Sequence, residues 1–358
     1  MNSVWFKSWA WSVLVVLVLG VENVVGNDPN ECAATAPPKA RPSMPDYVIK
    51  HAPLVWTHSQ DPYQPSDIEA QVKNSVPKIN YSVVTGVPPQ LSLNNLNELN
   101  KMGGEKIYLT SKEGITALPS WFKGVRPNKN GKTDGAISSA IIVRDHGNGV
   151  VDAFYFYFNA YNQGNTVFGM QFGNHVGDWE HNMIRFKNGK PDAIWYSQHA
   201  RGQAFKFSAT EKRGDRPVVF SSNGSHAVYA TAGTHDHLIP GLDLPAGLLE
   251  DECDEGYLWD PTLSAYKFSY DGSTKTFTPL EPGTPVNWLY FNGKWGDEQL
   301  PDDSPDQFEI FGQRKYTSGP TGPIFKDLDR RNICPPNIRP CLVLPWLTST
   351  EADVQVEW

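Results

Sequence analysis

Period-two alternation marks the middle of the chain. The run from Val150 to Tyr161 contains the letters FYFYF, so successive aromatic side chains point to opposite faces of a strand. Asn148-Gly149, a dipeptide typical of two-residue hairpin turns, joins this run to the apolar segment Ala140–Arg144. The two predicted faces carry Phe154, Phe156 and Phe158 on one side and Tyr155 and Tyr157 on the other. We therefore expect an antiparallel hairpin whose second strand belongs to a hydrophobic core.

The same pattern recurs further along the chain. Asn188-Gly189 is a second hairpin signal, and it joins His181–Phe186 to Ala193–His199. Val218–Ser221 and Ala227–Ala230 form a third candidate pair, and Asn292-Gly293 marks a later turn. Several short strands joined by tight turns are typical of a β-sandwich. The sequence predicts a mainly β protein, an antiparallel sandwich with long loops and a few short helices.

Helical patterns are confined to short segments before these strands. Pro65–Lys73 is one candidate helix, and Leu93–Met102 is another that Gly103-Gly104 would end. Leu54–Trp56 reads as a short strand. We expect one sandwich domain over residues 47–358, preceded by an extended Pro- and Ala-rich lead-in over residues 27–46.

Composition narrows the class of protein. The chain has 358 residues, of which 12% are aromatic, so it has ample apolar surface to bury and is not disordered. Thirty glycines and 29 prolines break it into segments too short for a coiled coil. The net charge of −8 gives no electrostatic basis for binding nucleic acid, so we expect no nucleic-acid partner.

Residues 1–26 read as a secretory signal peptide. Lys7 precedes the apolar run Trp9–Val21, which is too short to span a bilayer, and small residues follow it before Asn27. No second apolar run of that length occurs later. We expect a secreted protein, or one in the lumen of the vacuole or endomembrane system, with no stable membrane insertion after signal cleavage.

The cysteines and sequons agree with that route. Four cysteines predict two disulfides with three possible connectivities, and the two that flank residues 335–340 are close enough to pair with each other. None of the cysteine spacings suits zinc, and we assign no metal ligand. The cysteines are Cys32, Cys253, Cys334 and Cys341, and the predicted glycosylation sites are Asn80 and Asn223.

The densest group of chemically active residues is the segment 173–181. In a strand that begins near Asp178, this residue and Glu180 would share one face with Ile184 and Phe186. The other face would carry Trp179, His181, Met183 and Arg185, and the pattern does not decide which face is core. Further polar residues lie at neighbouring strand ends: Tyr196, His199, Arg201, His226 and the segment Thr234–His237.

Three interpretations of this group remain open. A histidine beside a carboxylate provides acid–base chemistry near neutral pH. Carboxylates with imidazoles also suit a divalent metal ion. The third interpretation is a buried hydrogen-bond network that ties loops to the sandwich. A serine nucleophile is disfavoured because the chain has no Gly-x-Ser-x-Gly motif.

Several motifs in the chain match a known family from about Tyr47 to Pro335. They are Gly177-Asp-Trp-Glu-His181, Tyr196-Ser-Gln-His199, Arg216-Pro-Val-Val-Phe220, Asn223-Gly-Ser-His-Ala227, Trp259-Asp-Pro261, Trp288-Leu-Tyr290 and Gly319-Pro-Thr-Gly-Pro323. On these motifs the chain resembles the fungal vacuolar protein sorting-associated protein 62 family. The family name describes sorting and implies no chemistry.

A subgroup of similar secreted fungal proteins implies an activity. These proteins are hetero-Diels-Alderases that dehydrate a hydroxymethyl tropolone to a quinone methide and guide its addition to a humulene-type sesquiterpene. Such chemistry needs a general acid, for which His181, His199 or His226 would serve, with Asp178 or Glu180 orienting it. It would use terpenoid and polyketide substrates and no cofactor. The substrate-binding residues would be Arg185 and Arg201, for the tropolone oxygens, and Trp179 and Tyr196, for the apolar parts.

A second resemblance implies a different function. Asp178-Trp-Glu-His181, after His175, is similar to the heptapeptide of the necrosis- and ethylene-inducing proteins, secreted cytolysins with a divalent-cation site. Gly177 stands where those toxins have a histidine. The remaining alternative is a vacuolar or secretory protein that acts in sorting or binds glycans without catalysis.

Overall fold

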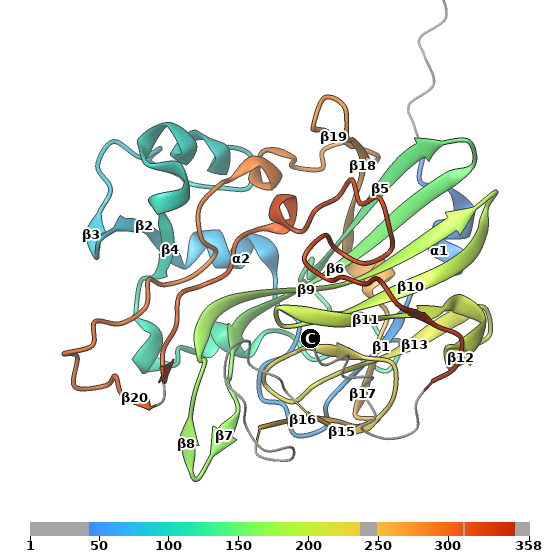
Figure 1. The fold of residues 1–358 in the computed structure, drawn as a ribbon. Helices are drawn as coiled ribbons and strands as arrows, with labels where there is room; N and C mark the ends of the chain where they lie inside the picture. The colour runs from blue at the N-terminus through green and yellow to red at the C-terminus, as the bar shows by residue number, and fades with distance from the viewer. Residues whose placement is uncertain (1–42, 237–248, 311, 348–358) are drawn as a thin grey trace, which may run out of the picture. The chain divides into compact units, whose positions relative to one another are not determined.

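An eight-stranded sheet is the central element of the protein (Figure 1). The computed structural model describes residues 43–236, 249–310 and 312–347, which belong to one compact unit, residues 41–358. The strand order is β19-β18-β5-β6-β9-β10-β11-β22. The bounds are β5 Ser139–Gly147, β6 Val150–Asn162, β9 His175–Lys187, β10 Lys190–Gln198, β11 Arg201–Lys206, β18 Ala265–Asp271, β19 Thr276–Pro279 and β22 Val343–Leu344.

A second, smaller sheet packs against one face of the first. It runs β12-β13-β1-β17, with β14 paired to β13. Val55, Val219 and Trp259 of this sheet share a buried core with Tyr155 and Tyr157 of β6. The bounds are β1 Leu54–Thr57, β12 Lys212–Arg213, β13 Arg216–Ser221, β14 Val228–Tyr229 and β17 Tyr257–Trp259. The mainly β sandwich is thus confirmed.

The other face of the large sheet is covered by loops and short helices. Phe154, Phe156 and Phe158 lie on this face, in a core with Trp179 and Trp288. The FYFYF strand therefore has two buried faces, as the alternation of its rings requires. The helices are α1 Asp46–Lys50, α2 Ile68–Lys73 and the 3₁₀ segments η1 Leu96–Met102, η2 Gly104–Lys106, η3 Ile115–Ala117, η4 Ser120–Lys123, η5 Phe207–Ala209, η6 Pro261–Ser264, η7 Asn287–Tyr290 and η8 Pro323–Phe325.

Short hairpins and ribbons complete the described structure. A three-stranded sheet and three two-stranded ribbons lie outside the sandwich. Their strands are β2 Ser75–Ile79, β3 Ser82–Val83, β4 Tyr108–Ser111, β7 Thr166–Val167, β8 Met170–Gln171, β15 Gly233–Asp236, β16 Glu250–Cys253, β20 Glu309–Ile310 and β21 Gln313–Arg314.

The predicted hairpins are confirmed. Asn148 and Gly149 have φ of 51° and 75°, and Asn188 and Gly189 have φ of 49° and 73°. Positive φ at both central residues is the type I′ turn, whose twist matches that of the flanking strands. These two turns join β5 to β6 and β9 to β10. The third pair, β13 with β14, is also antiparallel.

Not all pairs are antiparallel. β18 pairs with β5, β22 with β11, and β1 with β13 in parallel. Each of these pairs joins strands that are far apart in sequence, so no turn signal announces them. The large sheet is therefore antiparallel in its central strands and mixed toward its edges, whereas the smaller sheet has a parallel pair, β1 with β13, at its centre.

Both predicted helices exist, with changes. The Asp67 side chain accepts a hydrogen bond from the backbone N–H of Ala70, and α2 begins only after it. Pro65 and Ser66 instead pair with the end of β6: Pro65 bridges to Asn159, and the N–H of Ser66 donates to the carbonyl of Phe158. The Leu93–Met102 segment forms the 3₁₀ helix η1 rather than an α-helix.

One predicted disulfide is present. Cys334 and Cys341 are bonded, with their Cα atoms 5.6 Å apart. Cys253 is a buried free thiol, and Cys32 lies outside the described residues. The predicted signal peptide and nearly all of the lead-in also lie outside them. No helix in the described ranges is long and apolar enough to cross a bilayer.

Candidate functional site

Strand β9 carries two polar clusters that its alternation keeps apart. We call Asp61, Asp178, Glu180, His199, His226 and Asp251 the histidine–carboxylate cluster. We call Asp152, His181, Arg185 and Arg330 the arginine cluster. Asp178 and Glu180 belong to the first and His181 and Arg185 to the second, as their positions on opposite faces of the strand predict.

His226 is held between two carboxylates. Its Nδ1 lies 3.0 Å from Asp178 Oδ2, and its Nε2 lies 3.0 Å from the carbonyl oxygen of Tyr63 and 3.3 Å from Asp61 Oδ2. Both ring nitrogens thus face acceptors, which only the doubly protonated imidazolium satisfies. Burial lowers the pKa of His226, but Asp61 and Asp178 outweigh it and raise the pKa to about 10. His226 is therefore a fixed cation at neutral pH.

The partners of His226 are themselves fixed. Asp61 accepts hydrogen bonds from the backbone N–H groups of Tyr63 (2.8 Å) and Gly224 (3.0 Å). Burial alone would raise the pKa of Asp178, but the bond from His226 and the charge of His175 lower it. Asp178 is therefore ionised, and its negative charge is held inside the protein.

Glu180 has the opposite state. The residue is 6% exposed, and its Oε2 has no hydrogen-bond partner among the described residues. Burial raises the pKa of Glu180, the neighbouring charge of Asp178 raises it further, and the result is about 7. Two carboxyls two residues apart thus differ in charge, which is the arrangement that separates a proton donor from an ionised partner.

His199 approaches this pair from the turn between β10 and β11. Its Nε2 lies 2.7 Å from Asp251 Oδ2, and its side chain is 25% exposed. Burial lowers the pKa of His199, but Asp251 outweighs it and raises the pKa. Asp251 also accepts hydrogen bonds from Ser225, Tyr229 and Asn165, so the carboxylate is locked in place.

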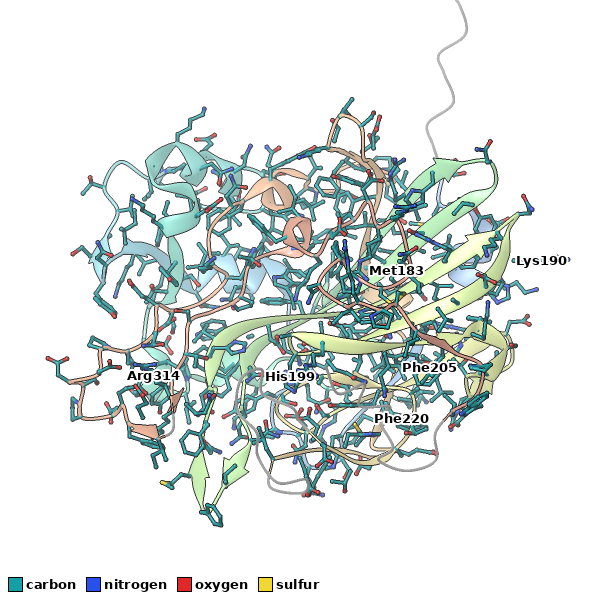
Figure 2. The ribbon with its side chains drawn as sticks, viewed as in Figure 1. Met183, Lys190, His199, Phe205, Phe220 and Arg314 are labelled. Carbon is teal, nitrogen blue, oxygen red and sulfur yellow. A yellow bond between two sulfur atoms is a disulfide. The ribbon has the colours of Figure 1, made fainter. Side chains whose placement is uncertain are left out.

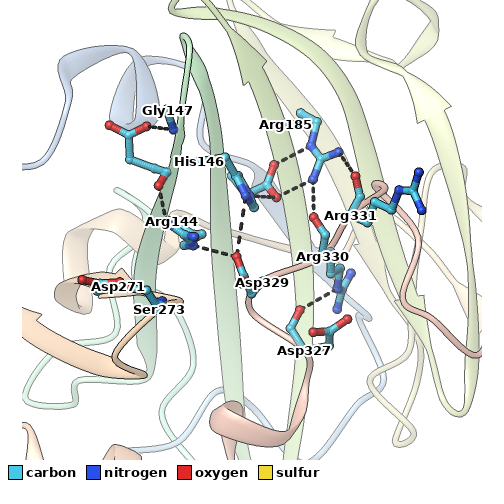
Figure 3. Close-up of polar contacts among 12 residues, drawn as sticks. Arg144, His146, Gly147, Arg185, Asp271, Ser273, Asp327, Asp329, Arg330 and Arg331 are labelled. Atoms are coloured by element: carbon cyan, nitrogen blue, oxygen red, sulfur yellow. Dashed lines mark hydrogen bonds and ion pairs between the residues drawn. The ribbon is translucent and has the colours of Figure 1, made fainter.

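The arginine cluster is built around Asp152, which is fully buried. Arg185 donates two hydrogen bonds of 2.7 Å to Asp152, and the ring Nε2 of His146 lies 2.8 Å from Asp152. Arg185 also donates to the carbonyl oxygens of Arg330 and Arg331 (Figure 3). The cluster therefore fastens the C-terminal segment to β6 and β9.

Arg330 is a buried cation that makes no carboxylate ion pair among the described residues. It donates to the carbonyls of Lys326 and Asp327 and, at 2.8 Å, to Nε2 of His181, and it lies 5.1 Å from the ring centre of Phe154. Burial lowers the pKa of His181 well below its ordinary value, and Arg330 lowers it further. His181 is thus a neutral acceptor inside the core.

The residues predicted to bind substrate are dispersed. Trp179 is 1% exposed and stacks on Trp288, and Tyr196 is fully buried with its hydroxyl 3.3 Å from a carbonyl oxygen. Arg185 is paired with Asp152. It also borders an open hollow, in which Lys187 and Lys206 both pair with Asp192. Arg201 is exposed and pairs with Gln198 across the turn that carries His199.

The two sequons differ in accessibility. Asn80 is exposed in the left-handed turn between β2 and β3, whereas Asn223 is half-buried. Ser225 of the second sequon is 2% exposed and bonded to Asp251. Both glycosylation sites remain predictions, and His237 of the predicted polar group lies outside the described residues.

Gly177, directly before Asp178 in β9, has a backbone conformation and a close contact that exclude other residues. Its φ is 71°, and a Cβ placed on it would lie 2.1 Å from the carbonyl oxygen of Trp295. Only glycine fits this position. The ring Nδ1 of His175, two residues earlier, lies 2.7 Å from the Gly177 carbonyl oxygen.

Four residues of these clusters were not predicted from the sequence: Asp61, Asp152, Asp251 and Arg330. Asp251 lies in an acidic run that resembles a solvated loop. It is 52 residues from His199, so no sequence motif indicates that the two side chains pair. Asp61 and Arg330 reach their partners across more than a hundred residues, which no spacing indicates. Within the described ranges, no three His, Cys, Asp or Glu side chains form a group suited to a metal ion.

This chain has a low similarity to two solved structures. Necrosis and Ethylene inducing Protein 2 from the causal agent of cocoa's Witches Broom disease is 14% identical, with a TM-score of 0.26 over 54% of this chain and 71% of that chain. Non-toxic HaNLP3 is 12% identical, with a TM-score of 0.28 over 64% of this chain and 79% of that chain. TM-scores this low carry no argument.

The relatives of known sequence are much closer. Residues 162–303 match the family model described as Vacuolar protein sorting-associated protein 62. The putative vacuolar protein sorting-associated protein TDA6 of Saccharomyces cerevisiae is 38% identical over 81% of this chain and 68% of its own length. Vacuolar protein sorting-associated protein 62 of the same yeast is 36% identical over 83% and 68%. The chain therefore belongs to the vacuolar protein sorting-associated protein 62 family.

Proposed function

We propose that the protein is an acid–base enzyme of small-molecule metabolism in which Glu180 donates the proton. The observation that carries this proposal is the state of Glu180: a buried carboxyl with a pKa of about 7 and one oxygen without a partner in the described structure. A buried acid that keeps its proton near neutral pH is suited to protonate a leaving group. Such groups are common at active sites.

The other members of the cluster would support this role. Asp178 is held ionised by His226, and its charge keeps the proton on Glu180. His199, the most exposed member with a raised pKa, would contact the substrate as a cation. His181 differs, because it is neutral and its Nε2 is occupied by Arg330. We therefore assign the general acid to Glu180 rather than to His181.

The specific reaction proposed is the dehydration of a hydroxymethyl tropolone, followed by hetero-Diels–Alder addition to a humulene-type alkene. Glu180 protonates the hydroxyl of the CH₂OH group, and the C–O bond breaks to release water. The ring hydroxyl loses its proton, which returns to the Glu180 carboxylate, so the quinone methide forms without a net change in the enzyme. The addition then forms C–C and C–O bonds with no redox step.

Arg201 is the residue proposed to hold the tropolone oxygens. It is exposed, it lies beside the turn of His199, and no side-chain ion pair of Arg201 occurs among the described residues. Arg185 has its guanidinium committed to Asp152 and two carbonyls. A single cation near the site would orient the anionic ring oxygens.

The test is product analysis with purified protein, a hydroxymethyl tropolone and humulene. We expect a stereodefined adduct, and Glu180→Gln should reduce its rate of formation by about 10²-fold or more. The matched control is Asp297→Asn, because Asp297 is also a buried carboxyl whose pKa burial raises, to about 6, and its bond is to the backbone of Ser111 instead. A folded protein that gives only the uncatalysed mixture would refute the activity.

A second function is favoured by the two yeast relatives, whose names associate them with vacuolar protein sorting. In this case the chain would act in delivery of proteins to the vacuole. The test is expression in yeast that lacks both relatives, with secretion of a vacuolar hydrolase as the readout. If the Glu180→Gln variant restores sorting as well as the wild type, sorting does not depend on acid–base chemistry.

A further inference from the structure

Three hairpins of this protein have the same turn but not the same residues. Phe168 and Gly169, between β7 and β8, have φ of 49° and 78°. These values match the turns at Asn148-Gly149 and Asn188-Gly189 within a few degrees. The β7–β8 hairpin therefore places phenylalanine where the other two have asparagine.

Phenylalanine at this position has no local explanation. Asparagine tolerates the left-handed conformation because its side chain bonds the backbone, whereas a bulky side chain is strained there. Burial does not compensate, since Phe168 is 84% exposed, the highest value among the large apolar residues of the described structure. A residue that breaks a local rule without a gain inside the fold points to a contact outside it.

The hairpin is braced so that its tip stays in solvent. Asn165 at its base donates to Asp251 and to the carbonyl of Glu250. At the other end, the ring of Phe172 packs edge-on against Phe308 at 5.3 Å, and the N–H of Gly173 donates to the carbonyl of Arg314. Figure 1 shows β7 and β8 projecting away from the large sheet, and Figure 2 shows His199 near their base.

The surroundings indicate what kind of surface the tip contacts. Residues 163–174 contain no charged side chain. Arg314, whose carbonyl accepts from Gly173 at the hairpin base, has its cationic side chain paired with both Asp302 and Glu309, so it leaves no positive charge for an anionic surface. A single ring buries at most about 250 Å², far less than the roughly 800 Å² that each partner buries in a stable protein complex. The tip therefore fits neither an anionic surface nor a protein partner.

We propose that Phe168 inserts reversibly into the interface of an uncharged lipid bilayer. An aromatic ring on a braced hairpin enters the boundary between headgroups and acyl chains at little conformational cost. The hairpin base is bonded to Asp251, the partner of His199, so this contact would hold the histidine–carboxylate cluster near the membrane surface. The inference goes beyond the proposed function and does not depend on it.

The experiment is flotation of the purified protein with phosphatidylcholine vesicles at millimolar lipid. We expect the wild type to float with the vesicles, and Phe168→Asn to reduce the bound fraction about tenfold. Phe168→Trp should retain binding. The matched control is Leu263→Asn, which removes another exposed apolar side chain, on η6, and should bind as the wild type does.

A folding defect cannot imitate the expected result. Asparagine suits the left-handed turn, so Phe168→Asn should unfold at the same urea concentration as the wild type or a higher one. Vesicle binding by Phe168→Asn equal to the wild type, or no binding by the wild type, would overturn the proposal. So would binding that needs phosphatidylserine, or a wild-type dimer that Phe168→Asn dissociates, since these outcomes assign the tip to anionic lipid or to a second copy.

Discussion

The two clusters on strand β9 place histidines in opposite charge states. His226 and His181 are both 3% exposed. His226 has two carboxylates around it and is a cation, whereas His181 has the Arg330 guanidinium beside it and is neutral. Burial lowers the pKa of both histidines; Arg330 lowers that of His181 further, whereas Asp61 and Asp178 outweigh burial at His226 and raise its pKa.

The difference also separates chemistry from anchoring. In the arginine cluster the donors of Arg185 and Arg330 are directed at Asp152, carbonyl oxygens and His181, so the C-terminal segment is fixed. In the histidine–carboxylate cluster, Glu180 keeps a proton and an oxygen without a partner in the described structure. We infer that one face of β9 stabilises the fold and that the other performs the proposed proton transfer.

The largest effect is expected from the anchoring cluster. Asp152→Ala leaves Arg185 buried without its carboxylate, which should lower the free energy of unfolding by about 3–5 kcal/mol. Urea denaturation followed by tryptophan fluorescence measures it. Activity per folded molecule should not change. Loss of activity with little loss of stability would show that the two clusters are not separate in function.

The next effect depends on pH and tests the other cluster. Folding raises the pKa of Glu180 from 4.5 to about 7, so the folded state binds this proton more tightly than the unfolded chain does. The contribution of Glu180 to stability therefore falls as the pH rises from about 4.5 to 7. Glu180→Gln should be more stable than wild type at pH 8, by up to about 3 kcal/mol, and nearly equal at pH 4.

The measurement is a set of urea unfolding curves of both proteins between pH 4 and pH 8. Asp297→Asn serves as the comparison, since the pKa of Asp297 is raised from 3.8 to about 6 and its pH window therefore lies at lower pH. A stability difference between Glu180→Gln and wild type that is the same at both ends of the pH range would contradict the raised pKa of Glu180.

A smaller effect is expected from the disulfide. Replacing Cys334 and Cys341 with serine opens a short loop, whose closure contributes about 2 kcal/mol in the chain-entropy model. The variant should have a lower melting temperature than the oxidised wild type. Its melting temperature should equal that of the wild type under reducing conditions. Since the loop follows Arg330, the change should loosen the arginine cluster and leave the pH dependence that comes from Glu180 intact. A shift in that dependence would link the two faces.

The smallest effect on stability is expected from an exposed ion pair, which serves as the reference for the buried ones. Asp302 pairs with Arg314 at the surface, where solvent screens the charges. Asp302→Asn should leave the urea midpoint unchanged within error. A clear loss of stability would mean that ion pairs of this protein do not differ by burial, which would weaken the contrast between the clusters.

The sequence alone allowed correct prediction of structural features that depend on residues close together in the chain. The two Asn-Gly turns and the alternation of Phe154, Tyr155 and their neighbours are local, so the central hairpins and both faces of β9 were predicted correctly. The parallel pairs were not predicted, because strands such as β5 and β18 are far apart in the sequence.

The site was predictable only in part for the same reason. Asp178, Glu180 and His226 stand out by composition. The charge state of His226 depends on Asp61, and that of His181 depends in part on Arg330; both partners come from distant segments of the chain. The alternation of β9 separated the two faces, but only the tertiary structure reveals which face received carboxylates and which received a guanidinium.

The close approach of Gly177 to Trp295 has an evolutionary consequence. The Trp295 carbonyl oxygen fills the space that any Cβ at position 177 would occupy. A lineage with this fold cannot replace Gly177 by one tolerated substitution. The loop that carries Trp295 would have to retreat in the same step, and it also accepts a hydrogen bond from Gln71. Position 177 and the Trp295 loop can therefore diverge only by coupled changes.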